Sequence, residues 1–317
     1  MAASVSAHLS ASAAARIEPF FADWSTHDRP GRGHRFCLWH EPAVSHPRGC
    51  VVQVHALAEE MNKCRRMTAL QARALAAHGY AVLQFDLFGC GDSDGDFGAA
   101  TWTQWIHDVQ VAIERAAELS SRTWPQHPLP RPVLWAQRAG ALLASAAAAD
   151  AGRPCDFLFW QPSTSGKLVL QQLLRLKLAA GLDGAQAKAL GEALRAGIAA
   201  GQTTEIAGYR ISADLACGLE AAVLAPAPTA AEGAALHWLE TSSRDLPTLL
   251  PASLPSLERW RAAGYSVRAE AVSGPPFWST VEIAEAPELV SASLALLEGR
   301  PLPSALAEAA AAAGNAA

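Results

Sequence analysis

Four short apolar runs, separated by stretches of helical periodicity, most constrain how this chain of 317 residues can fold. The runs cover residues 49–57, 81–89, 132–136 and 155–162. Apolar runs of this length, with little polar alternation, are typical of strands buried on both faces of a sheet. The helical stretches between and after them cover about residues 61–78, 102–119 and 139–149. Strands that alternate with helices predict parallel β-α-β units, and hence an α/β fold with a doubly wound, mostly parallel sheet.

This alternation breaks after the fourth strand. Residues 164–228 contain the helical patterns "KLVLQQLLRLKLAAGL" and "AQAKALGEALRAGIAAG", with a short pair of strands expected near residues 205–211. We expect this segment to form a helical cap over the carboxyl edge of the sheet. The pattern then resumes with strands at 234–242 and 266–272 and helices at 253–265 and 287–298. The expected organisation is a partly ordered N-terminal segment (1–29), a core (30–163 and 229–300), the cap (164–228) and a flexible tail (301–317).

Two segments carry a resemblance to a known superfamily. The stretch "DLFGCGDSDG", which begins at Asp86, is similar to the D-x-x-G-x-G-x-S loop that follows an early strand in α/β-hydrolases. The stretch "PVLWAQRAGALLASAAAA" (132–149) resembles their strand-to-helix elbow, in which G-x-S-x-G holds a nucleophile on a strained turn. The chain resembles the α/β-hydrolase superfamily over about residues 30–300, which implies an α/β-hydrolase-like sheet with a cap inserted in it.

A narrower resemblance involves "HALAEEMNKCRRMTALQARALAAHGYAVLQFDLFGCGDSDGDF" and "PVLWAQRAGALLA". Both stretches resemble the hydrolase-like family associated with exosortase A systems, the second of the two such families. The resemblance implies a bacterial protein with a role in exopolysaccharide production and the sorting of tagged surface proteins. By the same resemblance, the chain is expected to be a hydrolase or acyl transferase that acts on an ester or thioester.

An arginine stands where the elbow of this superfamily carries its nucleophile. The five residues run from Ala136 to Gly140 with Arg138 at the centre, and a guanidinium binds anions but does not attack a carbonyl. Glu240 and Asp245 are the candidates for the triad carboxylate. The loop at 272–280, where the superfamily places its histidine, contains none. The usual Ser-His-Asp mechanism is therefore missing, and a non-catalytic pseudo-hydrolase that binds an anion or metabolite is the alternative to an enzyme.

Other residues are weaker candidates for the missing groups. Cys64 and Cys90 are potential nucleophiles, although isolated cysteines more often act as small buried hydrophobes. Ser163 and Ser165 follow the fourth strand, where hydroxyl groups more often cap the next helix. His55 lies near the place where superfamily members keep an oxyanion loop. It is interpreted either as a base or donor or as a packed, hydrogen-bonded histidine.

The surroundings of Arg138 nevertheless indicate a ligand site. Ligands of open α/β sheets bind beyond the carboxyl ends of the strands, close to helix N-termini. In one interpretation Glu59 or Glu60, with Glu60 preferred, forms a structural ion pair with this arginine. In the other, Arg138 binds a carboxylate, a phosphate or a sugar-linked anion. The residues expected to assist are His55, Asn62, the elbow residues Gln137 and Ala139, and Trp278 as a stacking platform.

Composition and charge exclude several classes of partner. The net charge of -5 gives no electrostatic footprint for nucleic acid or for an anionic membrane surface. The six cysteines form no C-x-x-C pair, so we expect no metal site, no disulfide framework and a reducing compartment. We also expect no cofactor, no transmembrane segment and a cytoplasmic location. The expected partner is a small-molecule or carrier-linked acyl or sugar ligand of anionic character, and the oligomeric state is left open.

Overall fold

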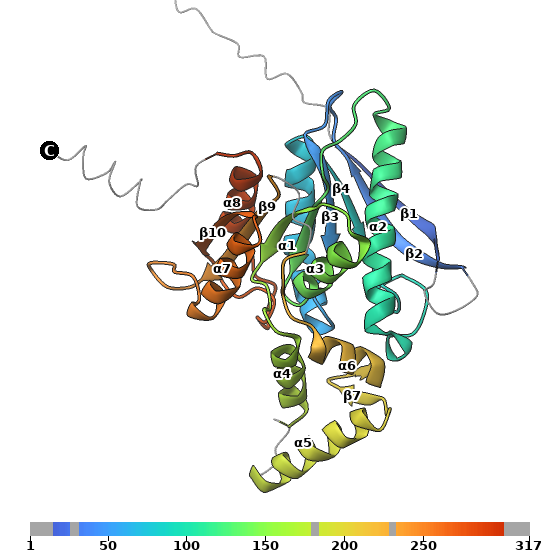
Figure 1. Cartoon of the computed structure of the whole chain (residues 1–317), viewed down its shortest axis with the longest axis vertical. Helices are drawn as coiled ribbons and strands as arrows, with labels where there is room; N and C mark the ends of the chain where they lie inside the picture. The colour runs from blue at the N-terminus through green and yellow to red at the C-terminus, as the bar shows by residue number, and fades with distance from the viewer. Residues whose placement is uncertain (1–14, 26–31, 179–183, 228–232, 301–317) are drawn as a thin grey trace, which may run out of the picture.

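The computed structural model describes residues 15–25, 32–178, 184–227 and 233–300. Within these residues, eight strands form one sheet in the order β1-β2-β4-β3-β5-β6-β9-β10 (Figure 1). β2 runs antiparallel to both β1 and β4, and the remaining neighbours pair in parallel. The predicted α/β fold with a doubly wound, mostly parallel sheet is thus confirmed.

The elements have the following bounds. The strands of the large sheet are β1 (Arg16–Ser25), β2 (Arg32–Glu41), β3 (Gly49–Val54), β4 (Tyr80–Phe85), β5 (Val133–Gln137), β6 (Asp156–Trp160), β9 (Ala235–Ser242) and β10 (Ser266–Ser273). The helices of the core are α1 (Glu59–Ala77), α2 (Trp102–Thr123), α3 (Gly140–Ala151), α7 (Leu254–Ala262) and α8 (Pro287–Leu297). Between β6 and β9 lie α4 (Gly166–Leu178), α5 (Gly184–Ala199), the hairpin β7 (Thr204–Ile206) and β8 (Tyr209–Ile211), and α6 (Ala213–Ala221).

The beginning of the chain differs from the expectation. The segment expected to be only partly ordered contributes β1, which pairs over ten residues with β2 at one edge of the sheet. The sequence did not reveal these two strands because charged residues interrupt their apolar pattern, among them Glu18 and Asp23 in β1 and Arg35 in β2. Residues 1–14 and the expected tail at 301–317 lie outside the described residues.

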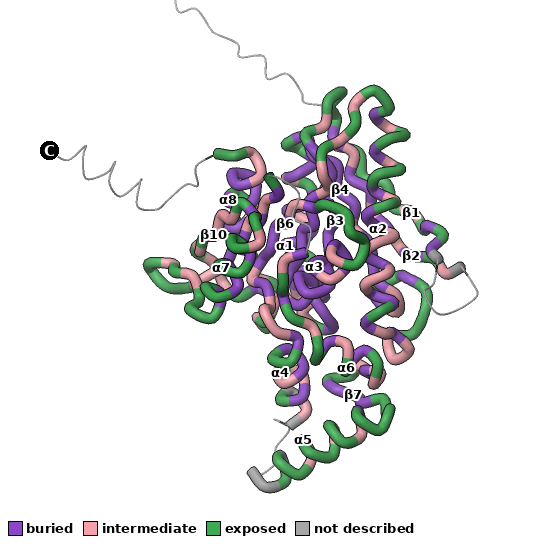
Figure 2. The backbone as a smooth tube through the Cα atoms, in the orientation of Figure 1, coloured by how far each residue is buried: buried purple, intermediate pink, exposed green. Residues whose placement is uncertain are grey.

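Helices cover both faces of the sheet. The buried side chains of β3 show why: Val52 and Val54 belong to the cluster that α2, α3 and α7 complete, whereas Val51 belongs to the cluster completed by α1 and α8. A strand that presents apolar side chains to two helical layers has no polar face, which is the pattern seen in the sequence. Figure 2 shows that the inner strands β3, β4 and β6 are mostly buried, whereas β10 at the edge of the sheet is not.

The segment between β6 and β9 forms a cap at one end of the molecule (Figure 1). It approaches the core closely at Gly218 of α6, where an added Cβ would lie 2.2 Å from the Cβ of Trp102 in α2. Ser212, which caps α6, also donates a hydrogen bond to the carbonyl of Ala100. In contrast, most of the placed residues of α5 are exposed (Figure 2). No helix of the described residues has the length and apolar character that a membrane span requires.

Candidate functional site

The elbow after β5 keeps a strained backbone. Arg138 has a φ of 53°, in the left-handed region that non-glycine residues seldom adopt. Its N–H donates to the carbonyl of Trp160 at 3.0 Å, and its carbonyl accepts from the N–H of Ser163 at 3.1 Å. Gly140 begins α3 against the end of β3, where an added Cβ would lie 2.4 Å from the carbonyl oxygen of His55. The turn therefore has the close strand-to-helix packing of a nucleophile elbow.

Three groups hold the guanidinium of Arg138. Nε and Nη2 each lie 3.1 Å from Oε1 of Glu60 at the start of α1. Nη1 donates to the carbonyl of Gln161 at 3.1 Å, and the Trp278 ring lies over the guanidinium carbon, 4.9 Å from ring centroid to Cζ. Glu60, rather than Glu59, is thus the partner of the arginine. Because a guanidinium has five N–H donors, two of them remain for a ligand.

The side chain of Glu60 is half-buried, with 31% of its surface exposed. Burial raises its pKa above the usual range, against the charge and the hydrogen bonds of Arg138, which lower it. The hydrogen bond from Arg138 Nε and the ion-pair contact from Nη2 both go to Oε1, and Oε2 has no hydrogen-bond partner among the described residues. A carboxylate with a raised pKa and a free oxygen can accept a proton from a ligand or from water.

A cavity of about 300 Å³ lies between the elbow and the cap, and we call it the elbow pocket. Its charged and polar residues on the core side are Glu59, Glu60, Lys63, Arg138, Ser163 and Ser279, and the cap adds Gln172 and Tyr209. Its apolar residues are Leu57, Ala58 and Trp278 of the core and Val169, Leu173, Ile206, Ala207 and Ile211 of the cap. The pocket therefore has an apolar wall, mostly from the cap, and a zwitterionic wall from the core. This arrangement suits a ligand that is part apolar and part polar.

Two backbone N–H groups near Arg138 are unoccupied. Ala139 follows Arg138 directly, and Leu57 lies in the loop between β3 and α1. Neither N–H has an acceptor among the described residues. An N–H from the residue after the nucleophile position and one from a loop near the elbow form the oxyanion hole of α/β-hydrolases. These two N–H groups are therefore candidate donors to a ligand beside Arg138. The described residues contain no cluster of side chains suited to a metal ion.

Backbone strain is concentrated around the elbow pocket. The non-glycine residues with a positive φ in the described ranges are Ala58, Arg138, Gln161 and Ala207. Ala58, Arg138 and Ala207 line the pocket, and the carbonyl of Gln161 accepts from Arg138. Strained conformations of this kind persist where the surrounding structure fixes them, and they cluster at functional sites.

Three residues expected at the site have other roles. His55 is buried, its Nδ1 bonds the carbonyl of Ala56 at 2.7 Å, and its Nε2 accepts from the N–H of Leu87. Burial also lowers its pKa, so it is a neutral, packed histidine outside the elbow pocket. The Gln137 side chain is buried and bonds Thr68 of α1 at 2.8 Å. Asn62 donates to the Tyr209 hydroxyl and does not line the pocket.

The two candidates for the triad carboxylate lie apart from Arg138. Glu240 is 2% exposed and accepts hydrogen bonds from Trp238 Nε1, from the N–H of Leu250 and from the Ser253 hydroxyl. It therefore fastens the segment between β9 and α7. Asp245 is exposed in that same segment and does not line the elbow pocket. Neither carboxylate orients a histidine, because the described part of the site offers none to orient.

The thiols and hydroxyls weighed as substitute nucleophiles are equally unsuited. Burial raises the pKa of the Cys64 and Cys90 thiols, so neither is a thiolate at neutral pH. Ser163 lines the elbow pocket, but no histidine lies on the lining with it. Sequence reasoning did not single out three groups that do belong to the site: Lys63, Tyr209 and the Gln161 carbonyl.

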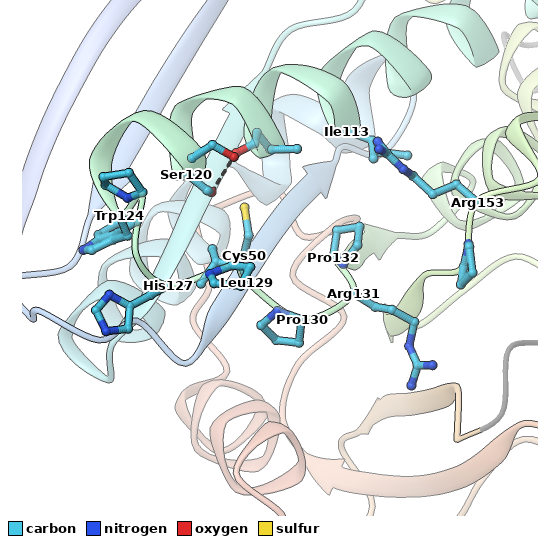
Figure 3. A pocket seen from close by; sticks show the side chains of 16 residues that line it. Cys50, Ile113, Ser120, Trp124, His127, Leu129, Pro130, Arg131, Pro132 and Arg153 are labelled. Atoms are coloured by element: carbon cyan, nitrogen blue, oxygen red, sulfur yellow. Dashed lines mark hydrogen bonds between the residues drawn. The ribbon is translucent and has the colours of Figure 1, made fainter.

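A separate cavity of about 430 Å³ lies at the amino ends of the strands (Figure 3). It is lined by Cys50 at the start of β3, by Trp124 at the end of α2 and by the residues that lead into β5. The elbow lies at the opposite, carboxyl ends of the same strands, so this cavity does not belong to the candidate site.

Comparisons with known proteins agree with the fold described above. The model of the serine aminopeptidase (S33) family matches residues 45–172. The esterase Est1E from Butyrivibrio proteoclasticus, bound to ferulic acid, aligns over 84% of this chain and 96% of its own, with a TM-score of 0.54 and 13% identity. A lipase in an open form aligns over 90% and 99%, with a TM-score of 0.53 and 16% identity.

A putative hydrolase from Agrobacterium vitis aligns over 90% of this chain and 98% of its own, with a TM-score of 0.51 and 14% identity. A search of curated protein sequences finds no match to the chain. Identities this low establish the fold and not the reaction. The chain therefore has the α/β-hydrolase fold.

Proposed function

We propose that this chain is a non-catalytic member of the hydrolase fold that binds an acyl-type ligand, with the polar head at Arg138 and the chain under the cap. The observation that carries the proposal is the arginine at the elbow. Its guanidinium is held by Glu60, the Gln161 carbonyl and Trp278, keeps two N–H donors free and borders an apolar pocket.

The chemistry of the head group follows from the remaining donors. A guanidinium presents N–H groups in a planar fork that matches the two oxygens of a carboxylate or phosphate. Lys63 adds a second cation to the pocket, while Glu59 and Glu60 limit its overall charge. A fatty acid, an acyl thioester on a carrier, or a sugar-linked anion fits these donors. The resemblance to the exosortase A-associated family supports a ligand from exopolysaccharide production.

A second candidate function is slow hydrolysis of an ester or thioester. The specific observation in its favour is Glu60, whose raised pKa and free Oε2 suit a general base acting on water. The N–H groups of Ala139 and Leu57 would stabilise the oxyanion. A carboxylate paired with arginine remains a weak base, so turnover would be far slower than that of a serine hydrolase.

One experiment separates the two functions. Octanoate and octanoyl-coenzyme A are titrated calorimetrically into the wild type and Arg138→Ala, and hydrolysis of p-nitrophenyl esters and of the same thioester is followed. Arg66→Ala serves as the matched control, because Arg66 is an exposed arginine of α1 that pairs with Glu285 outside the pocket. All variants are compared by circular dichroism to establish that they fold.

Binding without turnover, weakened about 30-fold or more in Arg138→Ala and unchanged in Arg66→Ala, is the result expected of the binding protein. Turnover that falls at least about a hundredfold in both Arg138→Ala and Glu60→Gln would instead assign the second function. If the wild type neither binds nor hydrolyses these acyl compounds, both proposals fail.

A further inference from the structure

We propose that a second pocket, between α1 and strands β2 to β4, binds a small neutral ligand rich in hydroxyl groups, of the size of a monosaccharide. This cavity of about 260 Å³ shares no lining residue with the elbow pocket. We call it the α1 pocket. Its lining includes Phe36, Leu38, Gln53, Arg65, Gln84 and Asp86.

The floor of the α1 pocket contains an unpartnered amide. Gln53 of β3 is 2% exposed, and its Nε2 has no hydrogen-bond partner. A buried amide donor without a partner costs about 1–3 kcal/mol, so such groups are normally satisfied by protein, by water or by a ligand. Gln53 is the only residue of β3 with a polar amide side chain; the other residues of the strand are a glycine, a cysteine and three valines. An amide in this place therefore indicates something that binds to it.

A second amide on the neighbouring strand faces the same pocket. Gln84 of β4 lies beside Gln53, since the register pairs Val52 with Leu83 immediately before them. The Gln84 Oε1 lies 2.6 Å from Nε2 of His40, a histidine that burial keeps neutral. Its own Nε2 has no partner among the described residues. Two adjacent amides thus offer free donors over one floor.

Two opposite charges lie in the same lining, beside the polar side chains of His55 and Thr68, which hydrogen-bond within the protein. Arg65 of α1 is exposed and forms no ion pair with the described residues. Asp86 follows β4, and its Oδ2 accepts from the N–H of Asp92, which leaves Oδ1 free. A carboxylate ligand would meet Asp86, and an amine ligand would meet Arg65. Because the charges cancel, the lining favours neutral hydroxyl groups, each of which both donates and accepts.

The remaining walls are apolar. Phe36 and Leu38 of β2 lie on one side, and Met61 and Ala69 of α1 lie on the other. A sugar ring presents C–H faces as well as hydroxyl edges, and such ligands combine hydrogen bonds at their edges with apolar contact on their faces. One side chain contacts both the α1 pocket and the elbow: Thr68 lines the α1 pocket and forms a hydrogen bond with Gln137, the residue before Arg138.

The test is calorimetric titration of the full chain with glucose, galactose and mannose, with glucuronate and glucosamine as charged counterparts. We expect a neutral hexose to bind with a Kd of about 1 mM or tighter. Gln53→Met and Arg65→Met should weaken this binding tenfold or more. Arg73→Met is the matched control, because Arg73 is an exposed arginine of α1 outside the pocket.

Gln53→Met should remain folded, because the amide that it removes makes no hydrogen bond, and its melting curve checks this. Three outcomes would overturn the proposal. The first is that no hexose binds and Gln53→Met melts at a higher temperature, which would mean that water alone occupies the pocket. The second is that the charged sugars bind more tightly than the neutral ones. The third is that binding is lost in Arg138→Ala but kept in Gln53→Met and Arg65→Met, which would place the sugar in the elbow pocket.

Discussion

At the scale of single residues, Arg138 adopts a conformation that costs an L-residue about 1–2 kcal/mol relative to the right-handed region. The contacts around it offset this cost: a hydrogen bond and an ion-pair contact to Glu60, a hydrogen bond to the Gln161 carbonyl, and the Trp278 ring over the guanidinium. These contacts join the elbow, the start of α1 and the loop after β10 at one point.

The raised pKa of Glu60 predicts pH-dependent binding of anions. When Glu60 is ionised it neutralises Arg138, and when it is protonated the site gains one positive charge. The affinity for an anion should therefore increase as the pH falls through the raised pKa of Glu60. We expect octane-1-sulfonate, whose charge is constant, to bind about tenfold more tightly at pH 5 than at pH 8. Isothermal titration calorimetry across this range measures the change.

The matched variants for this prediction are Glu60→Gln and Glu59→Gln. Glu60→Gln should bind the sulfonate tightly at every pH. Glu59→Gln should keep the pH dependence, because Glu59 interacts with Tyr209 and Asn62 instead of Arg138. An affinity that is independent of pH in the wild type would show that Glu60 does not control the charge of the site.

At the scale of elements, the contact between β3 and α3 fixes the elbow, and Gly140→Ala tests it. The new Cβ would lie 2.4 Å and 2.7 Å from the carbonyl oxygens of His55 and Val54, and backbone atoms cannot move aside as a side chain does. We expect the free energy of unfolding in urea to fall by about 3 kcal/mol. Gly49→Ala at the start of β3 is the control. It should lower the free energy of unfolding by about 1 kcal/mol or less, because the nearest neighbour of the new Cβ is a Tyr80 ring carbon at 3.5 Å.

The hairpin of the cap is tied to α1 by one side chain. The Tyr209 hydroxyl accepts from Asn62 at 3.0 Å and donates to Glu59 at 3.3 Å, while its ring packs 5.3 Å from that of Phe97. Tyr209→Phe keeps the ring and removes the hydrogen bonds, worth about 1 kcal/mol. Amide hydrogen exchange of residues 204–211 should then accelerate about fivefold. The amides of β5 serve as the internal control, and equal acceleration there would indicate general destabilisation instead.

The elements differ in how well the sequence predicts them. β3, β4, β5 and β6 are apolar on both faces, and this pattern alone predicts a parallel strand. β1 and β2 lack the pattern because charged residues interrupt it, and the arginine of β2 that is buried in the structure is expected from its type to be exposed. In the site, Arg138 and Glu60 are predictable from the elbow and the adjacent loop. The role of Glu240 is not predictable from the sequence, because Leu250 and Ser253 approach its carboxylate only in the folded chain.

At the scale of the whole molecule, one buried ion pair joins three segments that are distant in the sequence. Arg35 of β2 donates from Nε and Nη2 to the carboxylate of Asp108 in α2, and both side chains are fully buried. Asp108 also accepts from the N–H of Phe88, in the glycine-rich loop, and from Gln104. The pair therefore fixes the antiparallel edge of the sheet, the helix that covers it and the loop after β4 relative to one another.

Arg35→Met should destabilise the whole chain, because it leaves the Asp108 charge buried without its partner. The expected loss is about 3–5 kcal/mol in the free energy of unfolding, measured in urea. Arg35→Met combined with Asp108→Leu should regain much of that loss, since an apolar pair leaves no unpaired charge. Arg16→Met is the control, because Arg16 and Glu18 form an exposed pair on β1 that contributes about 1 kcal/mol or less. If Arg35→Met costs no more than Arg16→Met, the edge strands are held by the backbone pairing of β1 and β2 and not by the ion pair.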